Sequence, residues 1–126
     1  DFTNLSFLDQ EKVNFIEGDI TNQELLNEAF QGAKYVFHFA ALPSVHDSII
    51  NPVLTSEVNL IGTLKALEAS RINNVKKFIF SSSCAVYGNS LPNPVVESME
   101  PAPLSPYAIQ KLVSEKYCSG SPRFRK

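Results

Sequence analysis

The stretch Tyr35-Val36-Phe37-His38-Phe39-Ala40-Ala41 is nearly continuous in apolar residues, which is the pattern of a strand covered on both faces. We therefore expect it in the middle of a sheet. A second run, Lys77-Phe78-Ile79-Phe80-Ser81-Ser82-Ser83, begins apolar and ends in hydroxyls, so we expect chemistry at the carboxyl end of that strand. A shorter segment, Val13-Asn14-Phe15-Ile16, predicts one more strand near the start of the chain.

Helical patterns alternate with these strands. One helix is expected over residues 22–30, and the longest over residues 53–72, where apolar residues recur at helical spacing after Asn51-Pro52. A third helix should begin at Ser105, which can cap it, with Pro106 at its first position. Strands that alternate with helices predict a doubly wound parallel α/β sheet, with ligands bound beyond the carboxyl ends of the strands.

Composition excludes several classes of protein. The 126 residues carry a net charge of -2, which offers no basic field for nucleic acid, and no apolar run approaches the length of a membrane span. The opening Asp1-Phe2-Thr3-Asn4 does not read as a signal peptide, so a cytoplasmic location is expected. Cys84 and Cys118 have no metal-ligand spacing, and we expect free thiols and no metal.

The segment Ser105-Pro106-Tyr107-Ala108-Ile109-Gln110-Lys111 carries the chemistry. Tyr107 and Lys111 are four residues apart and therefore share a helix face. A nearby ammonium stabilises a phenolate, which is how a tyrosine becomes a general base. A Tyr-x-x-x-Lys pattern alone also fits an exposed polar pair, so its specificity comes from the serine run upstream.

With the serine run, the Tyr-x-x-x-Lys pattern and Val86-Tyr87-Gly88, the chain resembles the extended short-chain dehydrogenase/reductase family, most closely its nucleotide-sugar 4-epimerases. The resemblance covers roughly Val13 to Cys118 and implies a Rossmann-like sheet that binds NAD. Three further stretches look like the cofactor contacts of that family: Gly18-Asp19-Ile20, Phe37-His38-Phe39-Ala40-Ala41 and Val58-Asn59.

The resemblance implies a role for each of these stretches. Asp19 would accept from the adenine amino group with Ile20 beside the ring, although an aspartate before a helix is also a common cap. Asn59 would contact the cofactor or hold the catalytic region together, where an ordinary mid-helix asparagine is the alternative. The segment beneath the pyrophosphate and ribose would consist of Phe39, Ala40, Ala41, Leu42 and Pro43, and Ser81 and Lys111 would also lie at the cofactor.

The mechanism implied by the family is oxidation and re-reduction at one sugar carbon. Tyr107, as phenolate, would remove the proton of the 4-hydroxyl while hydride passes to NAD, and Ser83 would hydrogen-bond the same oxygen. Ser82 is the alternative if the register slips by one residue. The 4-keto sugar would receive the hydride on its opposite face. The resemblance gives no catalytic role to His38, expected to pack beside its strand, or to His46, expected in an exposed loop.

The substrate side is less specific. Leu42-Pro43-Ser44-Val45 with Ser48 resembles the loop that contacts UDP-hexoses, N-acetylhexosamines or hexuronic acids, and it does not choose among them. Family members that eliminate water or decarboxylate use an acidic residue just after the catalytic serine or threonine. Cys84-Ala85 occupies those places and cannot act as a carboxylic acid, which favours an epimerase over a dehydratase or decarboxylase. A reductase of the same family stays an alternative.

The chain also departs from the family. It contains no strand followed by Gly-x-x-Gly-x-x-Gly, the turn that binds pyrophosphate. We expect residues 1–118 to form a partial NAD-binding domain that lacks the first two strands and the C-terminal substrate domain, followed by a polar tail at 119–126. We therefore expect weak or no NAD binding by these residues alone. Exposed sheet edges favour association, including a homodimer, so an inactive truncated or interaction protein is the alternative of a different class.

Overall fold

The computed structural model describes residues 10–89 and 94–121. The first nine residues and the tail from residue 122 onward, both included in the sequence predictions, lie outside the described residues. The elements in chain order are η2 (Gln10–Lys12), α1 (Gln23–Ala29), β1 (Tyr35–His38), α2 (Val45–Ile50), α3 (Pro52–Ser56), η3 (Glu57–Ile61), α4 (Gly62–Ile72), β2 (Lys77–Phe80), η4 (Cys84–Tyr87) and α5 (Pro106–Gly120).

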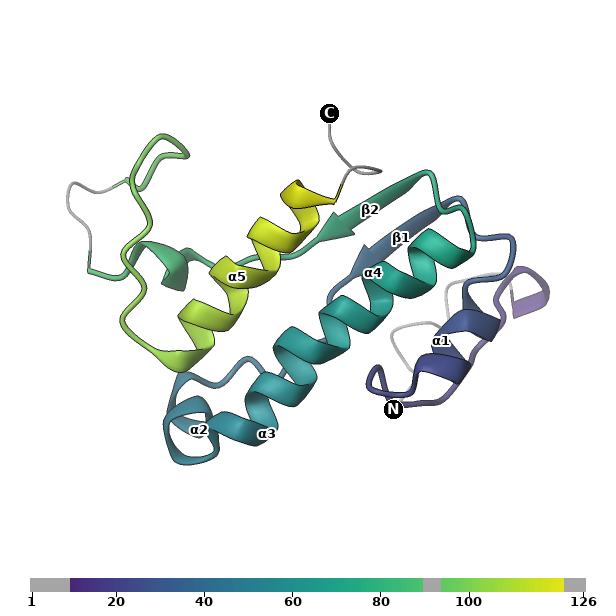
Figure 1. Cartoon of the computed structure of the whole chain (residues 1–126), viewed down its shortest axis with the longest axis horizontal. Coiled ribbons are helices and arrows are strands. Elements are labelled where there is room, and N and C mark those ends of the chain that lie inside the picture. Colours follow the sequence, from purple (N-terminus) through teal and green to yellow (C-terminus); the bar gives the residue numbers. More distant parts are fainter. Residues whose placement is uncertain (1–9, 90–93, 122–126) are drawn as a thin grey trace.

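The two strands pair in parallel, with Tyr35 opposite Lys77 and His38 opposite Phe80. Parallel pairing needs a long crossover between the strands, and the segment from α2 through α4 supplies it. Figure 1 shows α4 and α5 lying side by side across one face of the strands, with α1 beside α4. The prediction of an α/β fold with parallel strands is confirmed, while the doubly wound arrangement of an incomplete sheet stays a prediction.

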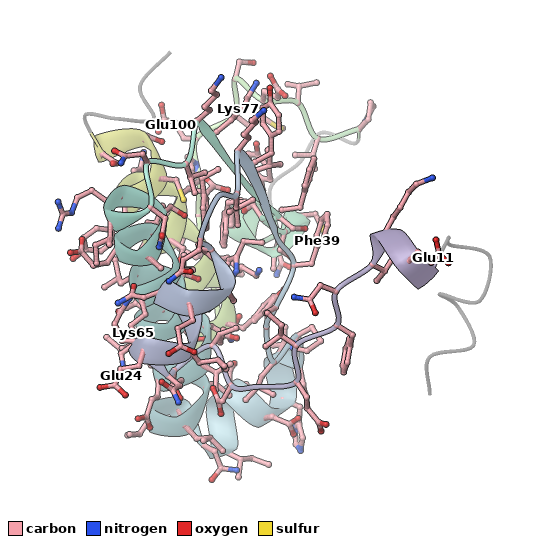
Figure 2. The ribbon with its side chains drawn as sticks, turned by 90° about the vertical axis from the view of Figure 1, so that its right-hand side faces the viewer. Glu11, Glu24, Phe39, Lys65, Lys77 and Glu100 are labelled. Carbon is pink, nitrogen blue, oxygen red and sulfur yellow. The ribbon has the colours of Figure 1, made fainter. Side chains whose placement is uncertain are left out.

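Two predictions about the strands are wrong for the described residues. The segment 13–16 forms no strand, and Phe15 and Ile16 are exposed, because a strand needs a neighbouring edge to pair with and this segment meets none. β1 is not covered on both faces either. It lies in a two-stranded sheet, and Tyr35, Phe37 and Phe39 are each more than half exposed, with Phe39 69% exposed. Figure 2 shows Phe39 on the side opposite the helical layer.

The helix predictions largely hold. Asn22 is the cap of α1, because its side chain accepts from the Leu25 backbone N–H, and Ser105 and Pro106 start α5 as expected. The expected helix over 53–72 is a continuous helical run from Pro52 to Ile72, but its middle, η3, is a π-helical turn. α5 is the longest single α-helix in the described part of the chain and continues to Gly120, so it includes the first two residues of the expected tail.

The apolar core is small and lies between α1, α4 and the strands. Leu26 packs with Ala66 and Ala69, and Phe30 and Phe78 close this cluster. Small alanine side chains on α4 allow α1 to approach closely. In the described part of the chain, no helix is both long enough and apolar enough to cross a membrane.

Much of the remaining interior is polar. The buried polar and charged side chains are His38, Ser48, Thr55, Asn59, Thr63, Ser70, Gln110, Lys111 and Ser114. Among the described residues, no buried side-chain nitrogen or oxygen lacks a hydrogen-bond partner. A buried polar network that is fully satisfied specifies one arrangement, because each group left unpaired would cost free energy. This network holds the candidate site.

Candidate active site

The first turn of α5 presents Tyr107 to the interior. Ser105 caps the helix by accepting from the Ala108 N–H at 3.2 Å, and Pro106 has no N–H to satisfy. The Tyr107 N–H donates to the Ser48 hydroxyl at 3.1 Å. Every early N–H of this helix therefore has a partner or needs none, which fixes the Tyr107 backbone.

Ser48 differs from its expected role. It was expected in a substrate-side loop, but it lies in the short helix α2, fully buried, and its hydroxyl donates to the Val45 carbonyl at 2.6 Å. Since this hydroxyl also accepts from Tyr107, it is occupied inside the protein. Ser48 therefore holds the Tyr107 backbone in place and has no exposed surface for a ligand. Ser44 caps α2 by accepting from the Asp47 N–H at 3.0 Å.

Lys111 lies one turn after Tyr107 on the same buried face and is only 4% exposed. Its ammonium donates to the Ser81 carbonyl at 2.8 Å and lies 4.7 Å from the centre of the Phe80 ring and 6.0 Å from that of the Tyr107 ring. Burial lowers the pKa of Lys111. Ser81 accepts one of the three ammonium hydrogens, so the cation is fixed at the carboxyl end of β2.

The two serines after Ser81 have different partners. The Ser82 hydroxyl donates to the Glu115 carboxylate on α5, whereas the Ser83 hydroxyl accepts from the Ala85 N–H at 3.2 Å and caps η4. Ser82 is therefore hydrogen-bonded to α5, whereas Ser83 lies at the turn where β2 ends. A hollow of about 470 Å³ lies beside them, lined in part by Ser82, Ser83, Cys84, Val86, Glu97 and Glu115.

The segment after β1 is held by one side chain. The Asn59 amide oxygen accepts from the Leu42 N–H at 2.7 Å, and its nitrogen donates to the Leu42 carbonyl at 3.1 Å. Asn59 is 2% exposed, so the structure places it between the helical run and the loop. Phe39 and Ala40 are exposed at the strand end, and Ala41 is half-buried.

Asp19 and Ile20 lie in the turn before α1. The Asp19 carboxylate accepts from the Thr21 N–H at 2.8 Å, and hydrogen bonds from the Thr21 backbone and side chain hold the Asp19 pKa below its usual value. The carboxylate is exposed and thus forms a local turn while still facing solvent. Ile20 packs on Gly62 of α4, where a Cβ would lie 2.6 Å from the Ile20 Cδ1. This contact ties the turn to the long helix.

His38 is buried behind these residues, next to the strand as expected. Its Nε2 lies 2.9 Å from the Thr63 hydroxyl, which itself donates to the Asn59 carbonyl at 2.7 Å. The hydroxyl therefore accepts from an Nε2–H, which fixes the neutral tautomer. Burial, with a smaller contribution from the charge of Lys111, lowers the His38 pKa to about 4.

Sequence reasoning missed two buried polar residues on α5, Gln110 and Ser114. Together with Tyr107 and Lys111 they occupy positions i, i+3, i+4 and i+7, which form one helix face. That spacing was visible in the sequence. A polar stripe reads as a solvated face, however, unless polar partners are known to lie opposite it.

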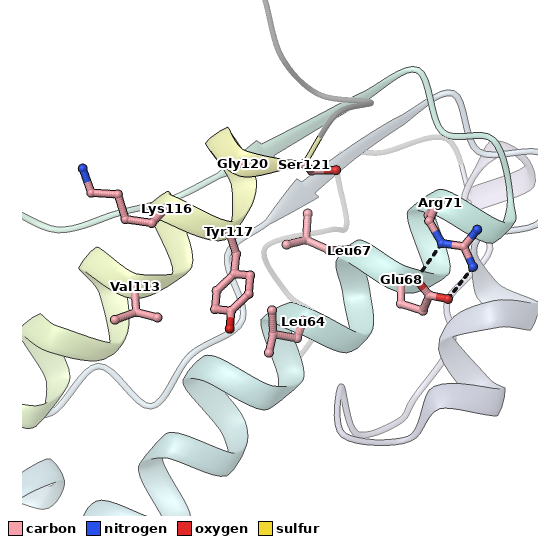
Figure 3. Close-up of a pocket in the computed structure, with 9 residues that line it drawn as sticks. All are labelled: Leu64, Leu67, Glu68, Arg71, Val113, Lys116, Tyr117, Gly120 and Ser121. Carbon is pink, nitrogen blue, oxygen red and sulfur yellow. Dashed lines mark hydrogen bonds and ion pairs between the residues drawn. The ribbon is translucent and has the colours of Figure 1, made fainter.

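A groove between α4 and α5 lies away from the candidate site. Figure 3 shows Tyr117 and Val113 of α5 facing Leu64 and Leu67 of α4, with the ion pair between Glu68 and Arg71 at 2.6 Å on the α4 side. The groove measures about 500 Å³ and is lined by Leu64, Leu67, Glu68, Arg71, Val113, Lys116, Tyr117, Gly120 and Ser121.

Comparison with known proteins gives the relatives of this chain. The model of the NAD dependent epimerase/dehydratase family matches residues 3–122. The chain is 36% identical over 108 residues to UDP-glucose 4-epimerase 3 of Oryza sativa subsp. japonica, which covers 84% of this chain. Its fold matches a UDP-glucose 4-epimerase from Brucella ovis in complex with NAD, with a TM-score of 0.83, 35% identity and 97% of this chain covered.

A second solved structure agrees. The UDP-N-acetylglucosamine 4-epimerase from Methanobrevibacter ruminantium M1, in complex with UDP-N-acetylmuramic acid, matches with a TM-score of 0.80, 37% identity and 96% of this chain covered. The chain spans less than half of these relatives: 29% of the rice protein, 40% of the Brucella chain and 42% of the Methanobrevibacter chain.

Proposed function

Because the chain belongs to the NAD dependent epimerase/dehydratase family, we propose that it carries the catalytic segment of a nucleotide-sugar 4-epimerase. One observation carries the proposal. Lys111 is buried on the same face of α5 as Tyr107, and its ammonium is fixed by the Ser81 carbonyl where β2 ends and Ser83 follows. A buried cation beside a phenol favours the phenolate, which can act as a base. The names of the relatives support a UDP-sugar as substrate.

In this proposal each side chain has one task. Tyr107 takes the proton from the 4-hydroxyl of the sugar and later returns it, and Ser83 hydrogen-bonds the same oxygen. Lys111 stabilises the phenolate between these two transfers. NAD, when bound, supplies the acceptor and donor of the hydride at the sugar carbon. The keto sugar is reduced on its other face to the 4-epimer, so the reaction leaves no net redox change.

The residues present fit parts of NAD. The Lys111 ammonium has hydrogens beyond the one given to Ser81, and Asp19 offers an exposed carboxylate to an amino group. Ala40 and Ala41 keep side chains small where a ligand would approach the backbone at the strand end. We propose Asp19, Ile20, Phe39, Ala40, Ala41, Leu42, Asn59, Ser81, Tyr107 and Lys111 as the residues that hold or border the cofactor.

Two residues separate this proposal from other reactions of the same family. Elimination of water or decarboxylation needs further proton transfers by an acidic group near the reacting carbon. Cys84 and Ala85 follow Ser83 at the start of η4, and neither carries a carboxyl group. The arrangement therefore favours epimerisation over a dehydratase or decarboxylase.

The proposal is tested by turnover and one matched pair of variants. The protein produced from its complete reading frame is given NAD with UDP-glucose or UDP-N-acetylglucosamine, and the 4-epimer is followed by proton NMR. Tyr107→Phe removes the base and should slow the reaction about 100-fold or more. Tyr117→Phe makes the same change on an exposed residue of α5 and should keep the parent rate. No epimer from the parent, or an undiminished rate with Tyr107→Phe, would contradict the proposal.

The exposed sheet face favours association as a second candidate function. Tyr35 and Phe37 of β1 and Phe39 just after it are each more than half exposed, and the Phe37 and Phe39 rings stack at 6.4 Å. Contiguous apolar surface of this kind marks interaction sites. If this face mediates association, the sedimentation coefficient should rise with concentration, and Phe37→Ser should abolish the rise. A monomer at all concentrations would exclude this candidate.

A further inference from the structure

The buried face of α5 carries two kinds of polar residue. Lys111 reaches the end of β2 with its ammonium 6.0 Å from the centre of the Tyr107 ring, whereas Gln110, 3% exposed, points to the helical run that contains Asn59. The Gln110 amide oxygen accepts from the Asn59 amide nitrogen at 2.8 Å. Its own nitrogen donates to the Thr55 hydroxyl at 3.1 Å and the Ser56 hydroxyl at 3.0 Å. Gln110 thus joins the helix of Tyr107 to α3 and η3.

The two hydrogen bonds between Asn59 and the Leu42 backbone determine the orientation of the Asn59 and Gln110 amides. A backbone N–H can only donate and a backbone carbonyl can only accept, so the two bonds to Leu42 set which end of the Asn59 amide is oxygen and which is nitrogen. The nitrogen has one hydrogen left, and it needs an acceptor. Gln110 supplies that acceptor, and its own nitrogen must then face Thr55 and Ser56.

The local backbone supports this arrangement. Asn59 lies in the middle of η3, where the helix widens into a π turn and the Gly62 N–H bonds to the Glu57 carbonyl. Such single π turns shift the side chains that follow them and often occur at functional sites. Here the turn lies where the Asn59 side chain reaches both Leu42 and Gln110. The widened turn and the buried amide pair are separate observations about the same residue.

We propose that Gln110 is a positioning residue that couples the loop after β1 to the helix that carries Tyr107. Through the Asn59 amide it fixes the Leu42 backbone, so the loop and Tyr107 hold one relative position. Gln110 fixes the loop relative to Tyr107 whatever the protein does. Its importance for catalysis rests on the proposed function, in which the loop borders the cofactor and Tyr107 contacts the substrate.

Two substitutions at Gln110 separate hydrogen bonding from packing. Gln110→Met fills a similar volume but offers no acceptor, so one Asn59 N–H is left buried and unpaired. Gln110→Glu keeps an oxygen acceptor for Asn59. As a matched control, Gln23→Met changes a glutamine on α1 whose amide bonds to Asn27 and to the Lys65 carbonyl, away from the loop.

The readout is hydrogen exchange at the Leu42 N–H, measured by NMR in isotopically labelled protein and divided by the rates of the Ala69 and Ser70 amides in the core of α4. The ratio removes any uniform loss of stability. Gln110→Met should raise the ratio about tenfold, as expected for the loss of one buried hydrogen bond. Gln110→Glu and Gln23→Met should leave it within about threefold of the parent.

An unchanged ratio with Gln110→Met, or an equal rise with Gln110→Met and Gln110→Glu, would overturn the proposal. If Gln110→Met does not fold, Ser56→Ala removes one acceptor of the Gln110 nitrogen and should raise the ratio in the same direction by about threefold; no rise would overturn the proposal. The measurement uses neither substrate nor NAD. A protein that fails to epimerise sugars can therefore still support or overturn the role of Gln110.

Discussion

The Lys111 ammonium donates a 2.8 Å hydrogen bond to the Ser81 carbonyl, and through it the middle of α5 is tied to the end of β2. This carbonyl belongs to the first residue after the strand, where the sheet ladder no longer needs it. The lysine is buried, yet its direct partner is a neutral backbone group. A buried cation held in this way contributes little to stability, because the cost of desolvating it offsets the hydrogen bond.

Lys111→Met should therefore separate activity from stability. The methionine fills the same space without the cost of a buried charge, so we expect the free energy of unfolding in urea to change by about 1 kcal/mol or less. If the proposed function holds, the rate of epimerisation should fall about 100-fold, because the proposed base Tyr107 loses its neighbouring cation. Lys116→Met, on the exposed side of the same helix, is the control and should change neither quantity. A large loss of stability with Lys111→Met would mean that the contact with Ser81 is mainly structural.

His38 should make the protein less stable in acid. Its pKa is about 4 in the folded protein, against about 6.5 when the chain is unfolded. Below pH 6.5 the unfolded chain binds the proton more readily, so the stability contributed by the neutral ring is present above that pH and is lost as the pH falls toward 4. Between pH 7.5 and pH 5 this loss amounts to about 2 kcal/mol.

His38→Phe tests this origin of the pH dependence. The new ring can pack against Phe78 and Phe80 as the imidazole does, and the Thr63 hydroxyl keeps its bond to the Asn59 carbonyl. Urea unfolding is measured at both pH values for the parent and the variant. The difference in stability between them should shrink by about 2 kcal/mol in the variant. An unchanged pH dependence would place its origin in the carboxylates.

The helix ends could be predicted from the sequence because their signals are local. Asn22, Ser105 and Pro106 act on N–H groups within three residues, so each cap is legible without knowledge of the fold. The strand expected at 13–16 failed because pairing depends on a distant edge, which an apolar pattern cannot report. The π turn of η3 has no comparable local signal, since it accompanies the contacts that Asn59 makes with Leu42 and Gln110.

In the candidate site, too, features with a local sequence signal could be predicted, and features that depend on distant partners could not. Helical spacing alone places Tyr107 and Lys111 on one face, and the apolar run before the serines places Ser81 at the strand end. That the two meet was predicted from the resemblance to the family. Gln110 and Ser48 could not be assigned, because their roles depend on partners more than 50 positions away in the chain. In the sequence, a serine whose hydroxyl is buried in a helix cannot be told from one exposed in a loop until its hydrogen-bond partner is known.

Ser48→Ala should destabilise the protein through Tyr107. Without the hydroxyl, the Tyr107 N–H is buried and unpaired, which costs about 1–3 kcal/mol. Ser44→Ala is the control: it removes the cap of α2, a short exposed helix, and should cost about 1 kcal/mol or less. Urea unfolding of both variants gives the comparison. Equal losses would indicate that Tyr107 finds another acceptor and that Ser48 does not fix the start of α5.

Gly88 ends η4, and its replacement should combine backbone strain with a steric contact. Its φ of +60° disfavours any other residue, and a Cβ would lie 2.1 Å from the Ala102 carbonyl oxygen. Gly32 has a similar φ of +73° with open space around it, so Gly32→Ala carries the cost of the backbone conformation alone, about 1–2 kcal/mol. Gly88→Ala should cost about 1–3 kcal/mol more, because its ψ of -133° at positive φ suits glycine alone and because a backbone oxygen cannot move aside as the end of a side chain can.

The extra cost of Gly88→Ala should appear at a particular place. The Ala102 N–H bonds to the Val86 carbonyl at 2.9 Å, so a displaced Ala102 would break the contact between η4 and the segment that leads to α5. Hydrogen exchange at the Ala102 amide should accelerate in Gly88→Ala and stay at the parent rate in Gly32→Ala, after correction for global stability. Equal losses of stability in the two variants, with Ala102 unaffected, would show that the segment at Ala102 moves aside without losing its contact with η4.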